Sequence, residues 1–350
     1  MRKEFPLMRT LVMGACSALL LCGGLLVSVP NASAQTPPAG QAQPPKKKKL
    51  PPGAKGFEQY AGRDASDKLV TGGATRGGPE VGVKENVAKA HDALARGNEA
   101  YDDAQAKEEA GQKQDAAAQY RAAAQAYQEA AAALPEMFRA YYLLGGSYEA
   151  LGQAKEAADA YKHAVTLKPD TESEQPLDQP GDLLRAYYHL GNMLANLGQH
   201  KEAIEAYGQI VKAIASSGNP KAKPNPVLLY NIGLSYAALG QQPDAIKFFR
   251  DAVEGFKARV DSDPDEKNNP TFEATYYNLG VAYGKLEQYA EAAEAFRQAL
   301  ALKPDHAEAH YNLGVAYYMT DNRQGLVEQQ KALAAAKPEL AKELGKLLTP

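Results

Sequence analysis

The pattern of apolar and polar positions divides the chain near residue 81. Beyond this point apolar residues recur three and four positions apart, as in amphipathic helices, and Pro and Gly punctuate the stretches between them. The seven letters YNLGVAY begin at Tyr277 and return thirty-four residues later at Tyr311. Self-similarity at such a period is typical of stacked repeat architectures. The sequence therefore predicts an all-α array of repeated helix pairs.

Five segments align on a Leu-Gly or Ile-Gly pair, and each predicts two amphipathic helices. The aligned glycines are Gly145, Gly191, Gly233, Gly280 and Gly314. Glycine inside a helix costs about 1 kcal/mol relative to alanine, so its return needs a reason. We expect a neighbouring helix to pass too close for a β-carbon there. The second helices supply small residues (Ala157, Ala203, Ala245, Ala292) and, four positions later, an aromatic beside them (Tyr161, Tyr207, Phe249, Phe296).

This combination of Leu, Gly, a Tyr or Leu three residues on, Ala twelve residues on, an aromatic and a closing Pro resembles the tetratricopeptide repeat. The resemblance covers residues 138–340 in five copies. It implies an α-solenoid of stacked antiparallel helix pairs whose first helices line a concave groove. The first four copies are spaced by 46, 42 and 47 residues, so loops or lengthened second helices are expected between them. In the last copy Leu326 and Gln330 replace the usual alanine and aromatic, which suits a terminal unit.

The flanking segments predict a further hairpin and a cap. Residues 81–137 read as a divergent lengthened helical hairpin, with two extra turns on each helix displacing its glycine and aromatic positions. After Pro338, Leu340, Leu344, Leu347 and Leu348 share one helix face, so residues 341–350 are expected to form the end of a C-terminal capping helix.

The N-terminal residues predict export. Residues 1–34 read as a signal peptide: Arg2, Lys3 and Arg9 precede the uncharged run 11–29, and Ala32-Ser33-Ala34 offers a cleavage site. The alternative is an uncleaved membrane anchor, since the run approaches spanning length. Residues 35–80, rich in Pro, Lys and Gly, are expected to be a disordered linker. Its Lys46–Lys49 run is interpreted as a solubilising tail, or alternatively as a contact with a membrane surface or the cell wall.

The composition and the absence of known motifs limit the functions that the sequence supports. The formal net charge is −3, and −5 after cleavage, which argues against a nucleic-acid partner. Both cysteines lie within the leader, so the mature chain has no disulfide. No G-x-S-x-G, phosphate-loop or HExxH motif occurs. His306 and His310 are four apart but lack a third ligand nearby, so packing is favoured over metal binding. We predict no enzyme activity, cofactor or metal.

The candidate binding residues lie on the first helix of each copy. Counting from residues 138, 184, 226, 273 and 307, positions 2, 5, 9 and 12 form a stripe opposite the buried one. We call this stripe the first-helix face. Its candidate residues are Arg139, Tyr142, Arg185, Tyr188, Asn192, Tyr230, Leu234, Tyr277, Val281, Tyr311, Val315 and Tyr318. Position 5 is Tyr in every copy, which suits an extended peptide. The alternative is that these tyrosines pack one repeat on the next.

The functional expectation follows from the repeats and from the missing catalytic motifs. We expect a non-catalytic protein–protein interaction scaffold of the bacterial cell envelope that binds a peptide or protein in the concave groove, in the periplasm or, alternatively, secreted. The runner-up is an envelope-tethered spacer or assembly factor attached through its leader or its lysine-rich tail. An enzyme with a site shared with a partner chain is the third class.

Overall fold

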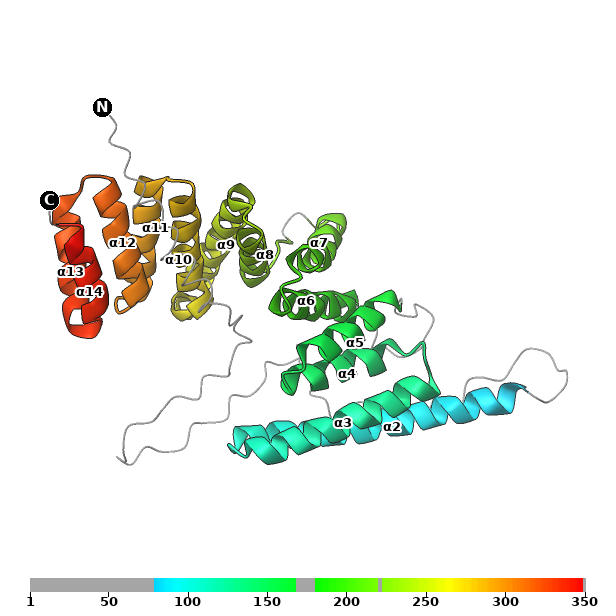
Figure 1. Cartoon of the computed structure of the whole chain (residues 1–350). Coiled ribbons are helices and arrows are strands. Elements are labelled where there is room, and N and C mark those ends of the chain that lie inside the picture. Colours follow the sequence, from blue (N-terminus) through cyan, green and yellow to red (C-terminus); the bar gives the residue numbers. More distant parts are fainter. Residues whose placement is uncertain (1–78, 168–179, 220–221, 349–350) are drawn as a thin grey trace. The chain divides into compact units, whose positions relative to one another are not determined.

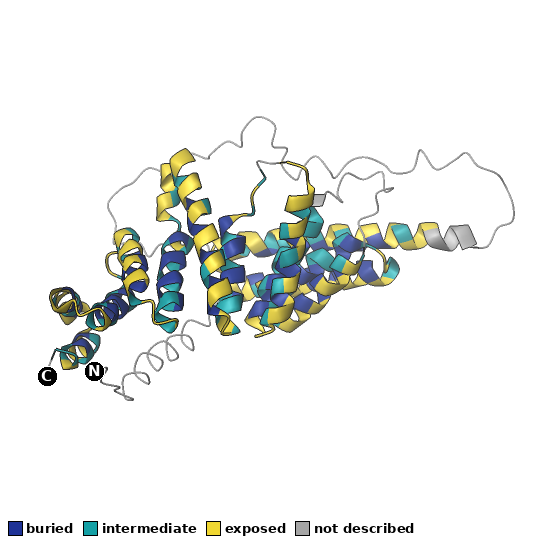
Figure 2. Ribbon diagram, turned by 90° about the horizontal axis from the view of Figure 1, so that it is seen from above, coloured by how far each residue is buried: buried dark blue, intermediate teal, exposed yellow. Residues whose placement is uncertain are grey.

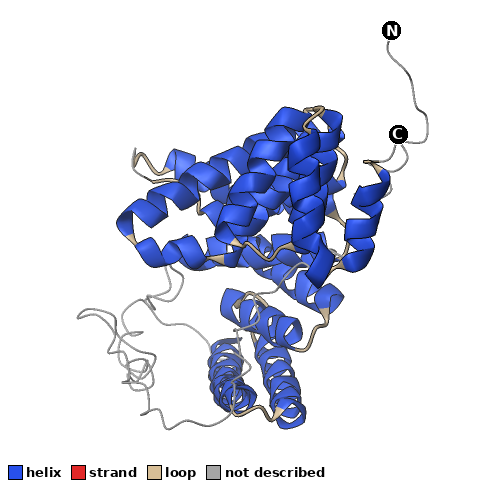
Figure 3. Ribbon diagram, turned by 90° about the vertical axis from the view of Figure 1, so that its left-hand side faces the viewer, coloured by secondary structure: helices blue, strands red, loops and turns tan. Residues whose placement is uncertain are grey.

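Helix pairs follow one another throughout the computed structural model, which describes residues 79–167, 180–219 and 222–348. Within these ranges all regular secondary structure is helical (Figures 1 and 3). The leader, the linker up to residue 78 and Lys46–Lys49 lie outside the described residues. No described helix is both long and apolar enough to cross a membrane. The predicted all-α solenoid of antiparallel helix pairs is confirmed.

The helices occur in pairs joined by short turns. They are α2 (Pro79–Glu109) and α3 (Lys113–Ala133), α4 (Phe138–Ala150) and α5 (Ala154–Thr166), α6 (Pro180–Asn196) and α7 (His200–Ser216), α8 (Pro226–Ala238) and α9 (Gln242–Ser262), α10 (Pro270–Lys285) and α11 (Tyr289–Leu302), α12 (Ala307–Met319) and α13 (Arg323–Ala336), then α14 (Pro338–Lys346). A 3₁₀ helix, η2 (Pro264–Asn268), precedes α10. The wide spacing of the middle repeats thus comes from longer helices, above all α9, as well as from loops.

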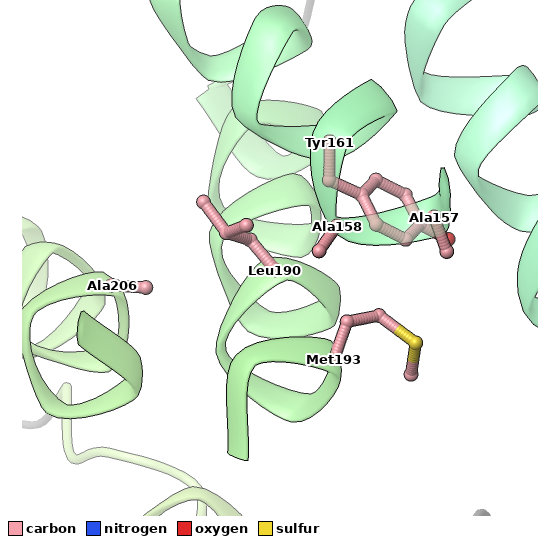
Figure 4. Close-up of a cluster of buried hydrophobic side chains, with 6 residues drawn as sticks. All are labelled: Ala157, Ala158, Tyr161, Leu190, Met193 and Ala206. Carbon is pink, nitrogen blue, oxygen red and sulfur yellow. The ribbon is translucent and has the colours of Figure 1, made fainter. Parts of the chain in front are cut away.

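Each pair stacks on the next through its second helix. Helices α5, α7, α9 and α11 contact the following first helices α6, α8, α10 and α12, and α8, α10 and α12 also contact one another in order. Figure 2 shows that buried positions follow the facing sides of these helices. The close-up in Figure 4 shows one such junction, where Tyr161 of α5 lies above Leu190 and Met193 of α6. The hairpins that the structure describes bury their apolar faces against one another, so neighbours share a core.

Four of the five repeated glycines lie against an aromatic ring from the second helix of their own hairpin. A β-carbon added at Gly280 of α10 would lie 2.7 Å from Cε1 of Phe296 of α11, a ring that is 3% exposed. The same relation joins Gly145 to Tyr161, Gly191 to Tyr207 and Gly233 to Phe249. The sequence predicts a closely passing helix at this position, with the aromatic in the space beside it. In the structure the ring itself takes the space, and the adjoining alanines are buried.

The turn between the two helices of a pair needs a left-handed residue. Gly111, Gly152, Gly198 and Gly240 have φ between 71° and 78°. In the fifth pair, between α10 and α11, Glu287 adopts φ 60° instead, a conformation that costs a side-chain-bearing residue roughly 1–2 kcal/mol. Asn-Pro pairs begin two of the first helices: the side chain of Asn269 accepts a hydrogen bond from the Thr271 amide at 3.0 Å and so caps α10.

The last pair is completed by α14. Gln330 stands where the other repeats have an aromatic, and the space over Gly314 is taken by Leu344 of α14, whose Cδ1 would lie 2.6 Å from an added β-carbon. Leu344 is fully buried and packs with Leu326 and Leu333 of α13. The capping helix therefore supplies the group that the terminal repeat lacks.

The first pair, α2 and α3, repeats the same contact at a larger scale. An added β-carbon at Gly97 would lie 2.5 Å from the ring of Tyr127. These two residues are thirty apart in sequence, whereas Gly145 and Tyr161 are sixteen apart. The difference of fourteen corresponds to two further turns on each helix between the contact and the turn at Gly111.

Candidate functional site

The position-5 tyrosines belong partly to the cores of their hairpins. The rings of Tyr230 and Tyr277 lie 5.9 and 5.8 Å from those of Phe249 and Phe296, the aromatics that cover the glycines. Tyr142 and Tyr188 contact Tyr161 and Tyr207 in the same way at 5.9 and 6.3 Å. These four tyrosines are half-buried, and Tyr311 is only 7% exposed. A partner on the first-helix face would meet the edges of four tyrosines and little of the fifth.

Their hydroxyls join each repeat to the next. The Nδ2 atoms of Asn231, Asn278 and Asn312 donate to the hydroxyl oxygens of Tyr188, Tyr230 and Tyr277, at 3.4, 3.2 and 3.2 Å respectively. Each asparagine directly follows the position-5 tyrosine of its own repeat. Burial raises the pKa of Tyr230, and the nearby Glu273 carboxylate raises it further. This ladder gives the tyrosines a packing role between repeats, while their role in binding a partner stays a prediction.

His189 takes the place of asparagine in the second repeat. Its Nδ1 lies 2.9 Å from Oε2 of Glu149, which also accepts a hydrogen bond of 2.8 Å from the Tyr161 hydroxyl. The imidazole stacks on the Tyr161 ring at 5.3 Å and meets Tyr142 edge-on at 6.2 Å. Burial raises the pKa of Tyr142, whereas the Arg185 charge lowers it. One carboxylate, one imidazole and two phenols from two repeats are thus brought together.

The polar end of the first-helix face also holds Arg139, Arg185 and Asn192. Arg185 is exposed, with 70% of its side chain accessible, and donates to Asp182 at 2.9 Å. Arg139 is half-buried. Asn192 is an internal acceptor: its Oδ1 receives the Tyr207 hydroxyl at 2.7 Å and the Asn231 amide at 3.1 Å. Of the three, Arg185 is therefore the most available to a partner.

The apolar end consists of half-buried side chains on the last three first helices: Leu234, Val281, Val315 and Tyr318. Each packs by one side on the core of its own repeat. At Gly284 of α10, an added β-carbon would have nothing within 4 Å. This end of the face combines accessible apolar surface with one open position.

The histidines singled out in the sequence have packing partners. His306 Nδ1 lies 2.6 Å from Glu273 Oε1, and its ring lies 4.7 Å from that of Tyr277. The two ring nitrogens of His310 lie 2.7 and 2.8 Å from Gln329 Oε1 and the Pro304 carbonyl oxygen. No group of three or more His, Cys, Asp or Glu able to hold a metal ion occurs among the described residues.

Sequence reasoning missed the groups that act between repeats. The Glu149–His189 contact joins residues forty apart, and Glu273–His306 joins residues thirty-three apart. Neither pair stands at a spacing that identifies it within one helix. The recurring asparagine after each tyrosine was a usable signal, since an amide repeated at a packing interface needs a partner.

Comparison with known families agrees with the helix pairs. Models described as "Tetratricopeptide repeat" match residues 138–171 and 182–258, and one described as "TPR repeat" matches residues 285–321. A search of curated proteins finds no significant match.

Several solved structures are similar in part. YrrB, described as a TPR protein with an unusual peptide-binding site, is 22% identical over 64% of this chain and 99% of its own, with a TM-score of 0.48. PilW, described as a widely conserved type IV pilus biogenesis factor, is 18% identical over 72% of this chain and 98% of its own, also with a TM-score of 0.48. MamA of Desulfovibrio magneticus RS-1 is 19% identical over 60% and 97%, with a TM-score of 0.42.

At these identities and TM-scores the solved structures define no specific functional relationship. The family matches stand without them. Two of them cover the pairs α4–α5, α6–α7 and α8–α9, in which an aromatic ring lies over a glycine, and the third covers the adjoining helices α11 and α12. This chain is a tetratricopeptide repeat protein.

Proposed function

We propose that the protein is a non-catalytic interaction scaffold that binds an extended segment of another protein along its first-helix face. Tetratricopeptide repeats are in general protein-interaction modules. The observation that carries the proposal is the half-exposed state of Leu234, Val281, Val315 and Tyr318, which follow one another along three consecutive first helices. A row of partly exposed apolar side chains favours a partner, whereas isolated exposed apolar residues need none.

A photo-crosslinking amino acid at Gly284 tests this proposal in the native host. The position has open space around it, so the probe would not disturb the core. The matched control carries the probe at Gln298, an exposed residue on the second helix of the same pair. Adducts with the same protein at Gly284 and none at Gln298 support the face as the binding surface. Equal adducts at both positions, or none at either, contradict it.

We further propose that the protein acts outside the inner membrane, in the periplasm. The support is the order of Arg2 and Lys3, the apolar run 11–29 and the cleavage site ending at Ala34. Mass spectrometry of the mature protein tests this directly. A first residue of Gln35 supports export with cleavage, whereas a retained leader supports the alternative of an envelope-tethered spacer held by its leader.

A role of Lys46–Lys49 in tethering predicts that replacing all four lysines by glutamine releases the cleaved protein from membrane or cell-wall fractions.

A further inference from the structure

The first-helix face carries one carboxylate with an unusual surrounding. Among the position-12 residues the first repeat has Glu149, whereas the second, third and fourth have Ala195, Ala237 and Gly284. Both hydrogen-bonding groups of Glu149, the Tyr161 hydroxyl and His189 Nδ1, engage Oε2. The other oxygen, Oε1, receives no hydrogen bond from the part of the chain that the structure describes. The Glu149 side chain is 24% exposed, so a donor from outside can reach it.

The neighbouring position 9 differs in the first repeat. It is Gly146 in the first repeat, and Asn192, Leu234, Val281 and Val315 in the others. An added β-carbon at Gly146 would lie 3.7 Å from the Tyr161 hydroxyl and 3.9 Å from the Tyr101 hydroxyl, with nothing nearer. The absent side chain therefore leaves two phenol oxygens of different hairpins facing the same space. We call Glu149, Tyr101, Tyr142, Tyr161 and His189 the Glu149 cluster.

The charges around the cluster are mainly negative on the side of α2. Burial raises the pKa of the Tyr101 phenol, and the carboxylates of Glu149, Glu108 and Asp102 raise it further. On the other side, the charge of Arg185 lowers the pKa of Tyr142, and Asp182, to which Arg185 donates a hydrogen bond, acts on that pKa in the opposite direction. His189 shares only Oε2 of Glu149. A positively charged donor can therefore form hydrogen bonds to Oε1 of Glu149 and to the hydroxyl oxygens of Tyr101 and Tyr161 at the same time.

We propose that the Glu149 cluster binds a lysine or arginine side chain of the partner that lies along the first-helix face. The carboxylate oxygen and the two phenol oxygens accept hydrogen bonds from the ammonium or guanidinium, and the aromatic rings contact its aliphatic stem. This inference rests on the proposed function, because it names the chemistry of one residue of the bound segment. It places a basic residue at the end of the segment opposite the apolar side chains Val281, Val315 and Tyr318.

Selection from a displayed library of random peptides tests the assignment with the purified full chain. The peptides are held between fixed flanks, so none has a free amino terminus near the random part. The test variant is Glu149→Gln, which keeps the size of the side chain and an acceptor for Tyr161. The control is Glu156→Gln on α5, an exposed second-helix residue, which changes the net charge equally. Wild type and Glu156→Gln are expected to select peptides enriched in Lys or Arg at one register, and Glu149→Gln to select peptides without that enrichment.

Binding measurements with resynthesised peptides give the size of the effect on affinity. Replacing the selected Lys or Arg by norleucine should weaken binding to wild type by roughly fivefold to tenfold, the range for a partly exposed charged hydrogen bond, and leave binding to Glu149→Gln nearly unchanged. Peptides selected without a basic preference, or with one that Glu149→Gln retains, would overturn the inference while the proposed function stands. Peptides that bind only through a free terminal amine would overturn the assignment to a side chain. If no protein selects any peptide, the proposed peptide binding itself fails.

Discussion

Substitution by alanine is expected to change the free energy of unfolding in opposite directions at two glycines that lie one turn apart on α10. At Gly280, an added methyl group would meet three ring atoms of Phe296 at 2.7 to 2.9 Å, and at Gly284 it would meet nothing within 4 Å. Both lie in the same helix, so alanine should gain about 1 kcal/mol of helix propensity at either position. Only the ring contact distinguishes them.

The magnitude follows from the packing of the ring. Phe296 is 3% exposed and lies among Ala292, Ala293 and Leu313, so it cannot swing away freely. Forcing a methyl group into such a core costs about 1–3 kcal/mol. Gly280→Ala should therefore lower the free energy of unfolding by about 1 kcal/mol after the propensity gain, and Gly284→Ala should raise it by up to about 1 kcal/mol. The expected difference between the variants is about 2 kcal/mol.

Urea unfolding followed by far-ultraviolet circular dichroism measures both variants, and amide hydrogen exchange in α10 and α11 locates the change, because repeat arrays can unfold locally. A second substitution, Phe296→Leu, should cost less in the Gly280→Ala background than in wild type, since a smaller side chain relieves the overlap. Equal stability of Gly280→Ala and Gly284→Ala would refute the reasoning, because the ring would then not be what holds the glycine at this position.

Three further outcomes follow from the turns, the cap and the buried phenols. Glu287→Gly should raise the free energy of unfolding by about 1 kcal/mol, because φ 60° is strained for glutamate and free for glycine; a loss of stability in urea titration would contradict this. Leu344→Ala should cost about 2–4 kcal/mol and remove exchange protection from α12 to α14 alone, since Leu344 is fully buried over the last repeat; loss spread over the whole array would contradict it. Burial raises the pKa values of Tyr161 and Tyr207 above the ordinary value of about 10, so the unfolded chain loses these protons first. Stability should therefore be full below about pH 10 and fall above it, with phenolate absorbance rising together with unfolding; phenolate formation in the folded protein would contradict this.

The helix pairs could be predicted because their signals are local. Apolar residues at helical spacing and the Gly–aromatic register identify α4 to α13 within short windows, and Leu340 and Leu344 identify the cap. The lengths of the helices were harder to predict from the sequence. The 21 residues of α9 and the Asn269-Pro270 start of α10 depend on where packing on the neighbours ends, which no single window records.

For the candidate binding residues, too, one part was predictable from the sequence and another part was not. The sequence placed Tyr188, Tyr230 and Tyr277 on one stripe, and left open whether they bind a partner or pack the repeats. In the structure their hydroxyls accept hydrogen bonds from asparagines of the following repeat. Membership of a stripe follows from helical periodicity, whereas the partner of each hydroxyl depends on the offset between two helices more than thirty residues apart.

The sequence by itself thus determined the repeat, the glycine positions and the tyrosine stripe, since each reflects the period of one helix or the length of one turn. Only the tertiary structure decided that an aromatic ring of the same hairpin covers Gly280, that Leu344 replaces that ring at Gly314, and that Glu149 meets His189. The physical reason is that these contacts are set by the rotation and approach of neighbouring helices. Those follow from the summed packing of many small side chains and not from any one spacing along the chain.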